Sequence, residues 1–187
     1  MSKLAFIFPG QGAQKAGMGK DFYENSEAAR SFFDQAQKIL DFDLKEMCFG
    51  EHEELNLTEY TQPCMVSVCL AIVQELKKRG INPDITAGLS LGEYGALIAS
   101  GAMTMADAFA VVRKRGIYMQ EAVPTGGAMT AVLGLDPQVI EDICKKTADE
   151  TNSVVSVANY NCPGQIVISG KTEAVAEAGE KLKEAGA

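Results

Sequence analysis

A strand, a sharp turn and a helix are predicted in succession at residues 85–100, and they constrain this chain more than any other feature. The apolar run Ile85–Ala87 leads into Gly88-Leu89-Ser90-Leu91-Gly92-Glu93, and a helix-forming stretch follows to Ser100. Glycines on both sides of a serine allow a turn too tight for flanking side chains, and the helix opening there offers free N–H groups and a positive dipole end. The pattern predicts that Ser90 is a nucleophile beside an oxyanion-binding helix start. The alternative is an ordinary serine cap at a helix start.

The charge balance and the apolar runs exclude two classes of partner. The 187 residues carry 25 acidic and 17 basic side chains, a net charge of -8, whereas a nucleic-acid-binding protein needs a broad basic surface. The longest apolar stretch, residues 63–73, is too short to cross a membrane, and Ser67 interrupts it. We therefore expect neither nucleic acid nor a membrane as a partner.

The cysteines indicate a reducing environment. There are five, at positions 48, 64, 69, 144 and 162, and no two form a CxxC pair. An odd number at irregular spacing is typical of reduced thiols in a cytoplasmic protein. Cys48 and His52 are four residues apart, but no second pair accompanies them. We expect a cytoplasmic location and no metal.

The first part of the chain combines few strands with many helices. Leu4–Phe8 is a continuous apolar run that stops at Pro9-Gly10, as in a buried strand that ends in a loop. Pro63 stands where the first turn of a helix accepts proline, and the helix after it is apolar on nearly all sides. The helices are expected at 24–40, 44–49, 63–78, 94–100 and 105–122, the last capped by Thr104.

A glycine-rich stretch at 124–127 marks the predicted boundary between two domains, 1–125 and 126–187. Beyond it the order is β-α-β-β-α, which is a ferredoxin-like unit without its last strand. The first domain offers only two convincing strands for its helices. We therefore expect an α/β fold with both halves incomplete, as in the front portion of a longer polypeptide. The second domain's strands are expected at 128–133, 154–158 and 166–169, and its helices at 137–149 and 172–185.

Arg115 falls on an apolar face of the helix expected at 105–122, whereas Arg113 and Lys114 point away from it. An inward-facing guanidinium needs an anion, because burying an unpaired charge is costly. Two partners remain open: a carboxylate of the protein itself, or the carboxylate of a bound substrate. The apolar positions on this face are Ala108, Val111, Val112, Met119 and Ala122.

The loop Phe8-Pro9-Gly10-Gln11-Gly12 is a second candidate for the site. Ligands of open α/β sheets bind at the carboxyl ends of the strands, where this loop lies. Gln11 could present its amide or its backbone N–H there; alternatively, the glycines serve only the backbone angles.

A serine nucleophile needs a base to take its proton, and the sequence offers no convincing one. The only histidine is His52, in the polar stretch 50–54. We expect that stretch to be a solvent-exposed loop, so His52 is a poor candidate for the base.

Four motifs follow one another along the chain: Phe8-Pro9-Gly10-Gln11-Gly12-Ala13-Gln14, Gly88-Leu89-Ser90-Leu91-Gly92-Glu93-Tyr94, Arg115-Gly116 with Met119-Gln120-Glu121-Ala122, and Asn159-Tyr160-Asn161-Cys162-Pro163-Gly164-Gln165. Together they closely resemble malonyl-CoA:acyl carrier protein transacylases, and the similarity extends from Lys3 to the C-terminus. The resemblance implies an α/β-hydrolase-like core with an inserted ferredoxin-like subdomain, both apparently incomplete at the C-terminal end.

The resemblance implies a ping-pong acyl transfer in fatty acid synthesis. Ser90 would take the malonyl group from coenzyme A as an ester and pass it to the phosphopantetheine thiol of acyl carrier protein. The backbone N–H groups of Gln11 and Leu91 would form the oxyanion hole, and Arg115 would pair with the malonyl carboxylate. Malonyl-CoA is then the substrate, no further cofactor is implied, and a monomer is the family's usual state. The other implied substrate-binding residues are Met119, Asn159 and Asn161.

Two departures from the family pattern stand out. Leu89 occupies a position that is usually histidine, which implies altered packing or acyl preference rather than lost chemistry. The family's catalytic histidine lies beyond the inserted subdomain, so we expect residues 1–187 to lack the general base and to turn over poorly alone. The alternatives are a serine hydrolase or thioesterase with the same elbow, and a catalytically inert fragment. Docking of a carrier protein could use Arg113, Lys181 or Lys183, which the sequence does not rank.

Overall fold

The computed structural model describes residues 3–187, and the chain divides into two separately packed units between Ala122 and Val123. Each unit has an apolar core of its own. Both units combine helices with strands, so the predicted α/β class is confirmed. None of the helices within residues 3–187 has both the length and the apolar character needed to span a bilayer.

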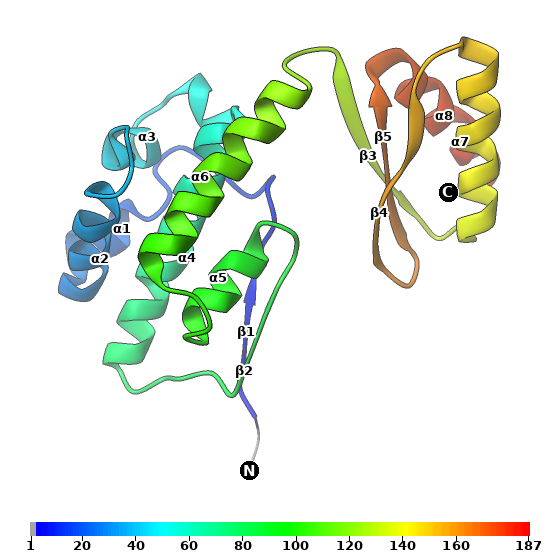
Figure 1. Ribbon diagram of the computed structural model, residues 1–187. Coiled ribbons are helices and arrows are strands. Elements are labelled where there is room, and N and C mark those ends of the chain that lie inside the picture. Colours follow the sequence, from blue (N-terminus) through cyan, green and yellow to red (C-terminus); the bar gives the residue numbers. More distant parts are fainter. Residues whose placement is uncertain (1–2) are drawn as a thin grey trace. The chain divides into compact units, whose positions relative to one another are not determined.

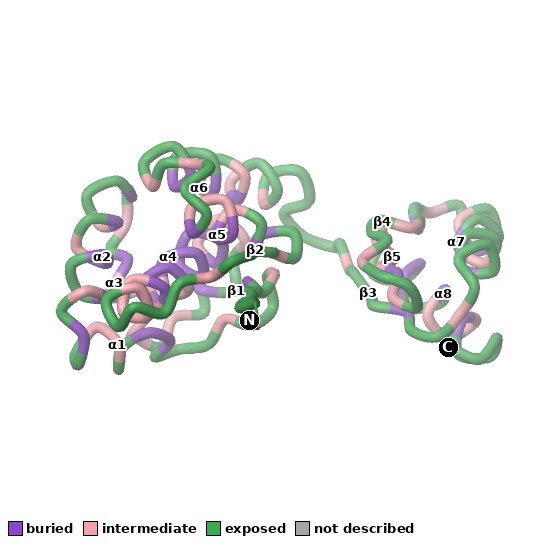
Figure 2. Tube along the Cα trace, turned by 90° about the horizontal axis from the view of Figure 1, so that it is seen from below, coloured by how far each residue is buried: buried purple, intermediate pink, exposed green. Residues whose placement is uncertain are grey.

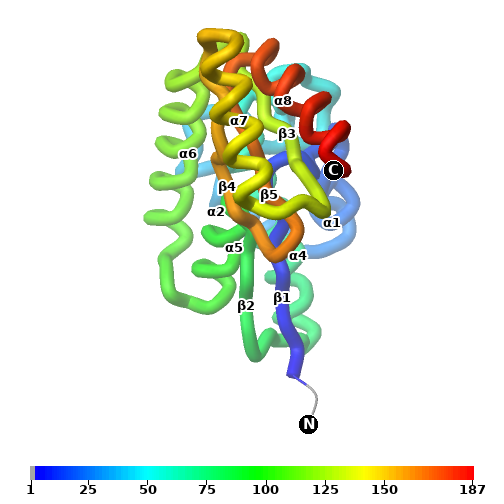
Figure 3. Tube along the Cα trace, turned by 90° about the vertical axis from the view of Figure 1, so that its right-hand side faces the viewer, coloured from blue at the N-terminus to red at the C-terminus, as the bar shows by residue number. Residues whose placement is uncertain are grey.

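Two parallel strands form the sheet of the first unit. β1 (Ala5–Phe8) pairs with β2 (Ile85–Gly88) in the register Ala5↔Ile85 to Phe8↔Gly88, and the strands lie side by side in Figures 1 and 3. Parallel strands need a long crossover connection, which the intervening helices supply. The helices of this unit are α1 (Lys20–Asn25), α2 (Glu27–Gln37), α3 (Leu44–Phe49), α4 (Thr58–Lys78), α5 (Gly92–Ala99) and α6 (Met105–Ala122), with a 3-10 turn, η1, at Glu53–Asn56.

Helix α4 is the centre of the first unit. Residues 61–67 are buried without a break, and both α2 and α6 pack against this helix. Phe33, Leu70 and Phe109, one from each of these three helices, are fully buried. Figure 2 shows the buried positions gathered on the inner sides of the helices. Removal of such side chains from water is the main favourable contribution to folding.

Two helix boundaries differ from the prediction. The stretch expected as one helix over 24–40 is two helices, because Ser26 is extended and caps α2 by accepting from the N–H of Ala29 at 3.1 Å. Helix α4 begins at Thr58 rather than at Pro63. Pro63 therefore lies beyond the first turn, which is the position where proline is best tolerated.

Arg113 compensates for Pro63 inside α4. Proline has no N–H, so the carbonyl of Glu59, four residues earlier, loses its usual helical donor. Nη1 of Arg113, from α6, donates to that carbonyl at 2.9 Å and to the Glu59 carboxylate at 3.0 Å. One guanidinium thus supplies the missing donor and neutralises the carboxylate beside it.

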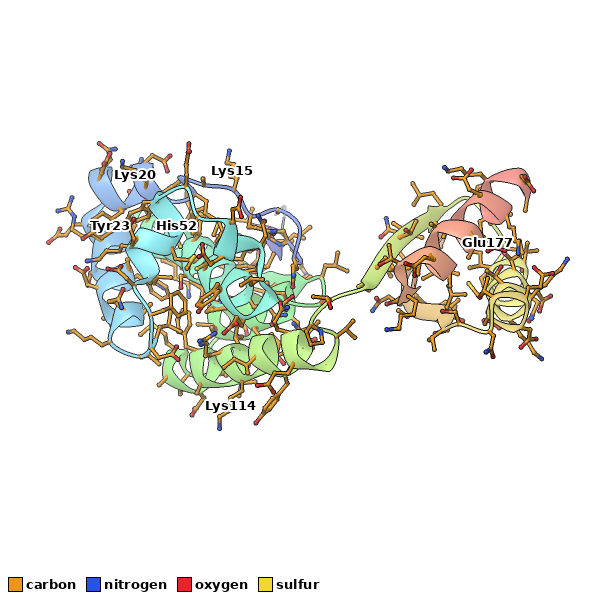
Figure 4. The ribbon with its side chains drawn as sticks, turned by 90° about the horizontal axis from the view of Figure 1, so that it is seen from above. Lys15, Lys20, Tyr23, His52, Lys114 and Glu177 are labelled. Atoms are coloured by element: carbon orange, nitrogen blue, oxygen red, sulfur yellow. The ribbon has the colours of Figure 1, made fainter. Side chains whose placement is uncertain are left out.

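The other contacts of Arg113 also bind it to the protein interior. It forms two hydrogen bonds to the carboxylate of Asp41, at 2.7 and 3.2 Å, and these hold the pKa of Asp41 below its ordinary value of 3.8. Its guanidinium lies over the rings of Phe42 and Tyr60. The side chain is only 15% exposed, so the expectation that Arg113 points away from the interior is wrong. Lys114, by contrast, points outward from α6 (Figure 4).

A three-stranded antiparallel sheet and two helices form the second unit. The sheet order is β3-β5-β4, and α7 and α8 cover one of its faces (Figures 1 and 3). Val132, Ile140, Ile168 and Leu182 belong to the core between them. The observed order β-α-β-β-α matches the prediction, and each element lies within a few residues of its expected range. The elements are β3 (Gly127–Leu133), α7 (Pro137–Thr151), β4 (Val155–Cys162), β5 (Gln165–Lys171) and α8 (Thr172–Glu184).

Candidate active site

The turn between β2 and α5 has the strained geometry of a nucleophile elbow. Ser90 has a φ of 50°, in the left-handed region that residues other than glycine rarely adopt. Side chains are excluded on both flanks: a Cβ at Gly88 would lie 2.0 Å from the carbonyl carbon of Gly92, and a Cβ at Gly92 would lie 2.2 Å from the carbonyl oxygen of Phe8. The predicted need for both glycines is confirmed.

The Ser90 hydroxyl does not cap the helix. Leu91 occupies the N-cap position of α5, and no side chain makes a capping hydrogen bond there. Ser90 is exposed, and its hydroxyl accepts a hydrogen bond from Arg115 instead. The alternative of an ordinary serine cap is therefore wrong.

Arg115 extends from α6 to the elbow. Its Nη2 donates to Oγ of Ser90 at 3.0 Å, and its guanidinium lies 5.8 Å from the ring centroid of Tyr94. Arg115 takes part in none of the salt bridges within residues 3–187, whereas Arg113 two residues away has two carboxylate partners. Of the two alternatives for Arg115, the internal ion pair is not found. A half-buried cation that has no carboxylate partner among the described residues therefore lies beside the serine hydroxyl.

Close packing of α6 on α4 places Arg115 at the elbow. A Cβ at Gly116 would lie 2.8 Å from Cα of Glu59, so glycine allows the two helices to approach closely. Arg115 flanks the buried face of α6 rather than lying on it, because the buried positions four residues apart are 108, 112 and 116. The expected apolar face was thus mostly wrong: Ala108 and Val112 are buried, whereas Val111, Met119 and Ala122 are exposed. Phe109 and Gly116, which were not predicted, complete the buried face.

Two backbone N–H groups without acceptors belong to the same region. The N–H of Leu89 donates to the carbonyl of Phe8 at 3.1 Å, which joins the loop after β1 to the elbow. Within residues 3–187, neither the N–H of Gln11, in that loop, nor the N–H of Leu91 donates a hydrogen bond. Unpaired N–H groups at a helix start and a strand end can stabilise a negatively charged oxygen.

A network of amides supports the Gln11 loop, and the sequence-based prediction missed most of it. Gln11 donates through Nε2 to Oγ1 of Thr58 at 3.2 Å and accepts from Nε2 of Gln62 at 3.4 Å. The N–H of Thr58 in turn donates to Oε1 of Gln120 at 2.9 Å. One signal was available, because Gln62 is a polar residue directly before an apolar run.

The remaining predicted substrate-binding residues lie in both units. Met119 of α6 is 46% exposed, and its sulfur accepts from Nε2 of Gln62 at 3.3 Å. Asn159 and Asn161 belong to β4 of the second unit, where the register of the strand is irregular. Asn159 is exposed, and Asn161 donates to Oε1 of Gln165 at 3.0 Å.

His52 is engaged at the surface near α3 (Figure 4). Its Nε2 lies 2.9 Å from a carboxylate oxygen of Glu46, and its side chain is 32% exposed. Within residues 3–187 the hydroxyl of Ser90 has a hydrogen-bond partner in Arg115 and none in His52. The structure therefore does not bring the single histidine of the sequence to the nucleophile.

Comparison with known proteins shows the family of this chain. Residues 5–187 match the family described as the acyl transferase domain. The chain belongs to this family. Members similar to it include the malonyl CoA-acyl carrier protein transacylase of Bacillus subtilis strain 168, which is 50% identical over 189 aligned positions that cover 100% of this chain and 59% of the relative. The transacylase of Staphylococcus aureus strain MSSA476 is 47% identical, with 100% and 60% covered.

Solved acyl transferase structures also superimpose on the chain. The malonyl CoA-acyl carrier protein transacylase of Clostridium perfringens gives a TM-score of 0.86 at 46% identity, covering 99% of this chain and 58% of the other. A malonyl-transacylase solved in complex with its type II PKS acyl-carrier protein gives 0.87 at 41% identity, with 99% and 60% covered. The resemblance inferred from the sequence motifs is confirmed. The chain spans about 60% of the length of the curated relatives it matches.

Proposed function

We propose that this chain carries the nucleophile and the acid-binding arginine of a malonyl transferase, which moves a malonyl group from coenzyme A to acyl carrier protein. The observation that carries the proposal is the contact of Arg115 with Ser90. The guanidinium of Arg115 has no carboxylate partner in the part of the chain that the structure describes, and it lies 3.0 Å from the hydroxyl of Ser90, whose backbone is strained. This arrangement suits a substrate with a thioester at one end and a carboxylate at the other.

The transfer proceeds in two steps. Oγ of Ser90 attacks the thioester carbonyl carbon of malonyl-CoA and gives up its proton, and the N–H groups of Gln11 and Leu91 stabilise the oxyanion that forms. The intermediate collapses, the C–S bond breaks, and coenzyme A leaves as a thiol after it gains a proton. In the second step the phosphopantetheine thiol of the carrier protein attacks the Ser90 ester, and Ser90 regains its proton.

In our proposal, residues 3–187 do not supply the general base of this mechanism. The single histidine, His52, is paired with Glu46, and the contact of Ser90 is with a guanidinium, which cannot accept a proton. We propose that a group outside residues 1–187 takes the proton of Ser90. By this argument the 187-residue chain alone reacts slowly with malonyl-CoA, because losing the base costs serine enzymes several orders of magnitude in rate.

Arg115 also determines the acyl preference in this proposal. A malonyl carboxylate pairs with the guanidinium, whereas an acetyl group leaves it without a partner in a site that has displaced water. Met119, which lies on α6 one turn beyond Arg115, is assigned to the binding of the acyl group. Asn159 and Asn161, on β4 of the second unit, keep the substrate-binding role that the family resemblance implies. The side chain of Leu89 lies next to Gly10, where an added Cβ would be 3.5 Å from it. Compared with the histidine usual in the family, Leu89 changes the packing next to the nucleophile and leaves the chemistry unchanged.

We assign the remaining features as follows. The first unit is the N-terminal part of an α/β-hydrolase-like core, and the second is most of a ferredoxin-like subdomain. The carrier protein belongs to fatty acid synthesis, and the protein acts as a cytoplasmic monomer, in keeping with five thiols that form no disulfide. Arg113 is not part of the carrier-docking surface because ion pairs and aromatic rings enclose it. Lys181 and Lys183, both paired with glutamates, remain candidates.

Intact mass spectrometry tests the proposal. The full-length gene product and its Ser90→Ala variant are each exposed briefly to malonyl-CoA under the same conditions. We expect a gain of one malonyl group on the wild type and none on the variant. An adduct that persists in Ser90→Ala, or none on the wild type, would refute the assignment of Ser90. The same measurement on residues 1–187 alone is expected to show little or no adduct, and rapid labelling there would show that the base is within these residues.

A further inference from the structure

Gln62 is a buried polar residue that the mechanism above does not use. It lies on α4 and is 0% exposed, in the run 61–67 where every position is buried. An amide buried without hydrogen bonds is costly. The contacts that Gln62 keeps therefore indicate what the residue does.

The amide of Gln62 touches two residues of the proposed site at once. Its Nε2 donates to Oε1 of Gln11 at 3.4 Å and to the sulfur of Met119 at 3.3 Å. Its Oε1 has no hydrogen-bond partner within residues 3–187. Gln62 thus connects the loop after β1 with α6, and both of its donor contacts are to residues for which a role in acyl transfer is proposed.

The direction of these hydrogen bonds fixes the orientation of the Gln11 side chain. Nε2 of Gln11 donates to the hydroxyl of Thr58, so its Oε1 faces Gln62. Thr58 and Gln62 are four residues apart on α4 and therefore share one face of the helix. The side chain of Gln11 is held between these two residues, with one hydrogen bond to each.

The backbone next to Gln11 has one hydrogen bond on its C-terminal side, from the N–H of Gly12 to Oε1 of Gln14 at 2.9 Å. Gln11 lies between Gly10 and Gly12, and Gly12 has a φ of +115°, a conformation in which glycine is permissive. The N–H of Gln11 makes no hydrogen bond within residues 3–187. A donor flanked by two glycines needs a side-chain anchor if its direction is to be fixed before the reaction begins.

We propose that Gln62 is a positioning residue for acyl transfer: through the side chain of Gln11 it fixes the backbone N–H that receives the oxyanion, and it holds Met119 at the same site. The inference rests on the proposed function. Gln62 acts through Gln11 and touches no reacting atom. Its loss lowers the rate of ester formation more than it changes the binding of malonyl-CoA, because the oxyanion develops only in the transition state.

The test compares Gln62→Met with Gln74→Met, measured in the protein as its gene encodes it. Both substitutions exchange the same side chains on α4, but Gln74 lies about three turns beyond the site. We expect Gln62→Met to slow malonyl-ester formation on Ser90 by roughly ten- to a hundredfold, with the half-saturating malonyl-CoA concentration changed by less than about threefold. Gln74→Met is expected to keep the wild-type rate. Equal rates in the two variants would overturn the proposal.

A conservative variant, Gln62→Glu, separates positioning from packing. When protonated, the carboxyl group that it introduces can donate to Oε1 of Gln11 as the amide does, and burial favours this neutral form. We expect the rate of Gln62→Glu relative to wild type to recover as the pH is lowered, while that of Gln62→Met does not. A constant ratio for Gln62→Glu over the pH range would count against a donor role. Melting curves identify any variant that has not folded.

Hydrogen exchange distinguishes failure of this inference from failure of the proposed function. If wild-type protein forms no ester at Ser90, the transferase assignment is wrong, whereas exchange of residues 10–14 still reports on the anchor. We expect faster exchange of this loop in Gln62→Met than in wild type or Gln74→Met. Unchanged exchange in Gln62→Met would show that Gln62 does not hold the loop.

Discussion

At the scale of single residues, two arginines two positions apart serve different purposes. Arg113 is enclosed by Asp41, Glu59 and two aromatic rings, whereas Arg115 contacts a hydroxyl and an aromatic ring and has no carboxylate within residues 3–187. Neighbouring positions on a helix differ by about 100° in direction, so residues two apart face opposite sides. The difference in partners makes Arg113 structural, and it leaves Arg115 in the state that its proposed role in binding a substrate carboxylate requires.

Removal of the Arg115 guanidinium should change acyl selectivity. In Arg115→Ala we expect the rate of malonyl loading on Ser90 to fall by about a hundredfold, because a charge-assisted hydrogen-bonded pair is lost. Acetyl loading should be unchanged or faster. Intact mass after exposure to each acyl-CoA measures both rates. Lys114→Ala removes a cation that points outward from α6 (Figure 4) and should alter neither; a hydrolase of neutral acyl chains would tolerate both changes.

The elbow glycines should not tolerate even one methyl group. Gly88→Ala places a Cβ 2.0 Å from backbone of the following helix, and we expect a loss of at least about 2 kcal/mol in the free energy of unfolding. Urea titration measures it. Gly179→Ala in α8, where a Cβ meets nothing within 4 Å, should instead be neutral or stabilising by up to about 1 kcal/mol. A Gly88→Ala variant as stable as wild type would contradict the close approach at the elbow.

At the scale of elements, α4 and α6 are joined by a hydrogen bond that replaces the one lost in α4 because of Pro63. The carbonyl left without a donor by Pro63 accepts from Arg113, and Gly116 allows α6 to come close enough. The same packing carries Arg115 to the elbow. A structural contact between two helices thus places a residue of the proposed active site.

A double-mutant cycle can measure the coupling energy between Arg113 and Pro63. Arg113→Met leaves a backbone carbonyl and two carboxylates without their partner, and we expect it to cost about 2–4 kcal/mol. Pro63→Ala restores an N–H that can bond to the Glu59 carbonyl. The cost of Arg113→Met should therefore be smaller in the Pro63→Ala background, by roughly 1 kcal/mol. Strictly additive changes in the free energy of unfolding would show that the two residues are not coupled.

At the scale of the whole molecule, two apolar cores with no residue in common stabilise the chain. One core runs from Phe8 to Val112, and the other from Val132 to Leu182. The stability of each unit therefore depends chiefly on its own buried side chains. The cooperative units of unfolding should follow this division.

Urea unfolding followed by hydrogen exchange should resolve two transitions. Leu70→Ala, in the first core, is expected to shift only the transition of residues up to 122, by about 2–5 kcal/mol. Ile168→Ala, in the second core, should shift only that of residues 123–187. Both residues are fully buried, so the two variants are matched. A single transition moved equally by either substitution would show that the units unfold together.

The sequence by itself determined most elements of the fold and indicated Ser90 as the candidate nucleophile. Short apolar runs and helix periodicity located the strands and most helices, and two glycines around Ser90 permit a turn too tight for side chains on its flanks. These signals are local, because backbone sterics and side-chain periodicity act over a few residues. At Ser26 the missed signal was a local helix cap on the N–H of Ala29, which Glu75 supports by accepting from the same hydroxyl. At Pro63 the partner is distant, because Arg113 supplies the donor that proline lacks.

Only the tertiary structure decided which side chains share the site. Whether Arg115 has a protein carboxylate as its partner depends on the helix against which α6 packs. The role proposed for Gln62 follows from its contacts with Gln11 and Met119, which only the structure shows. Residues 11, 62 and 119 are far apart in the chain, and no pattern along the sequence records which of them meet. Contacts of this kind follow from close packing, which depends on every element at once.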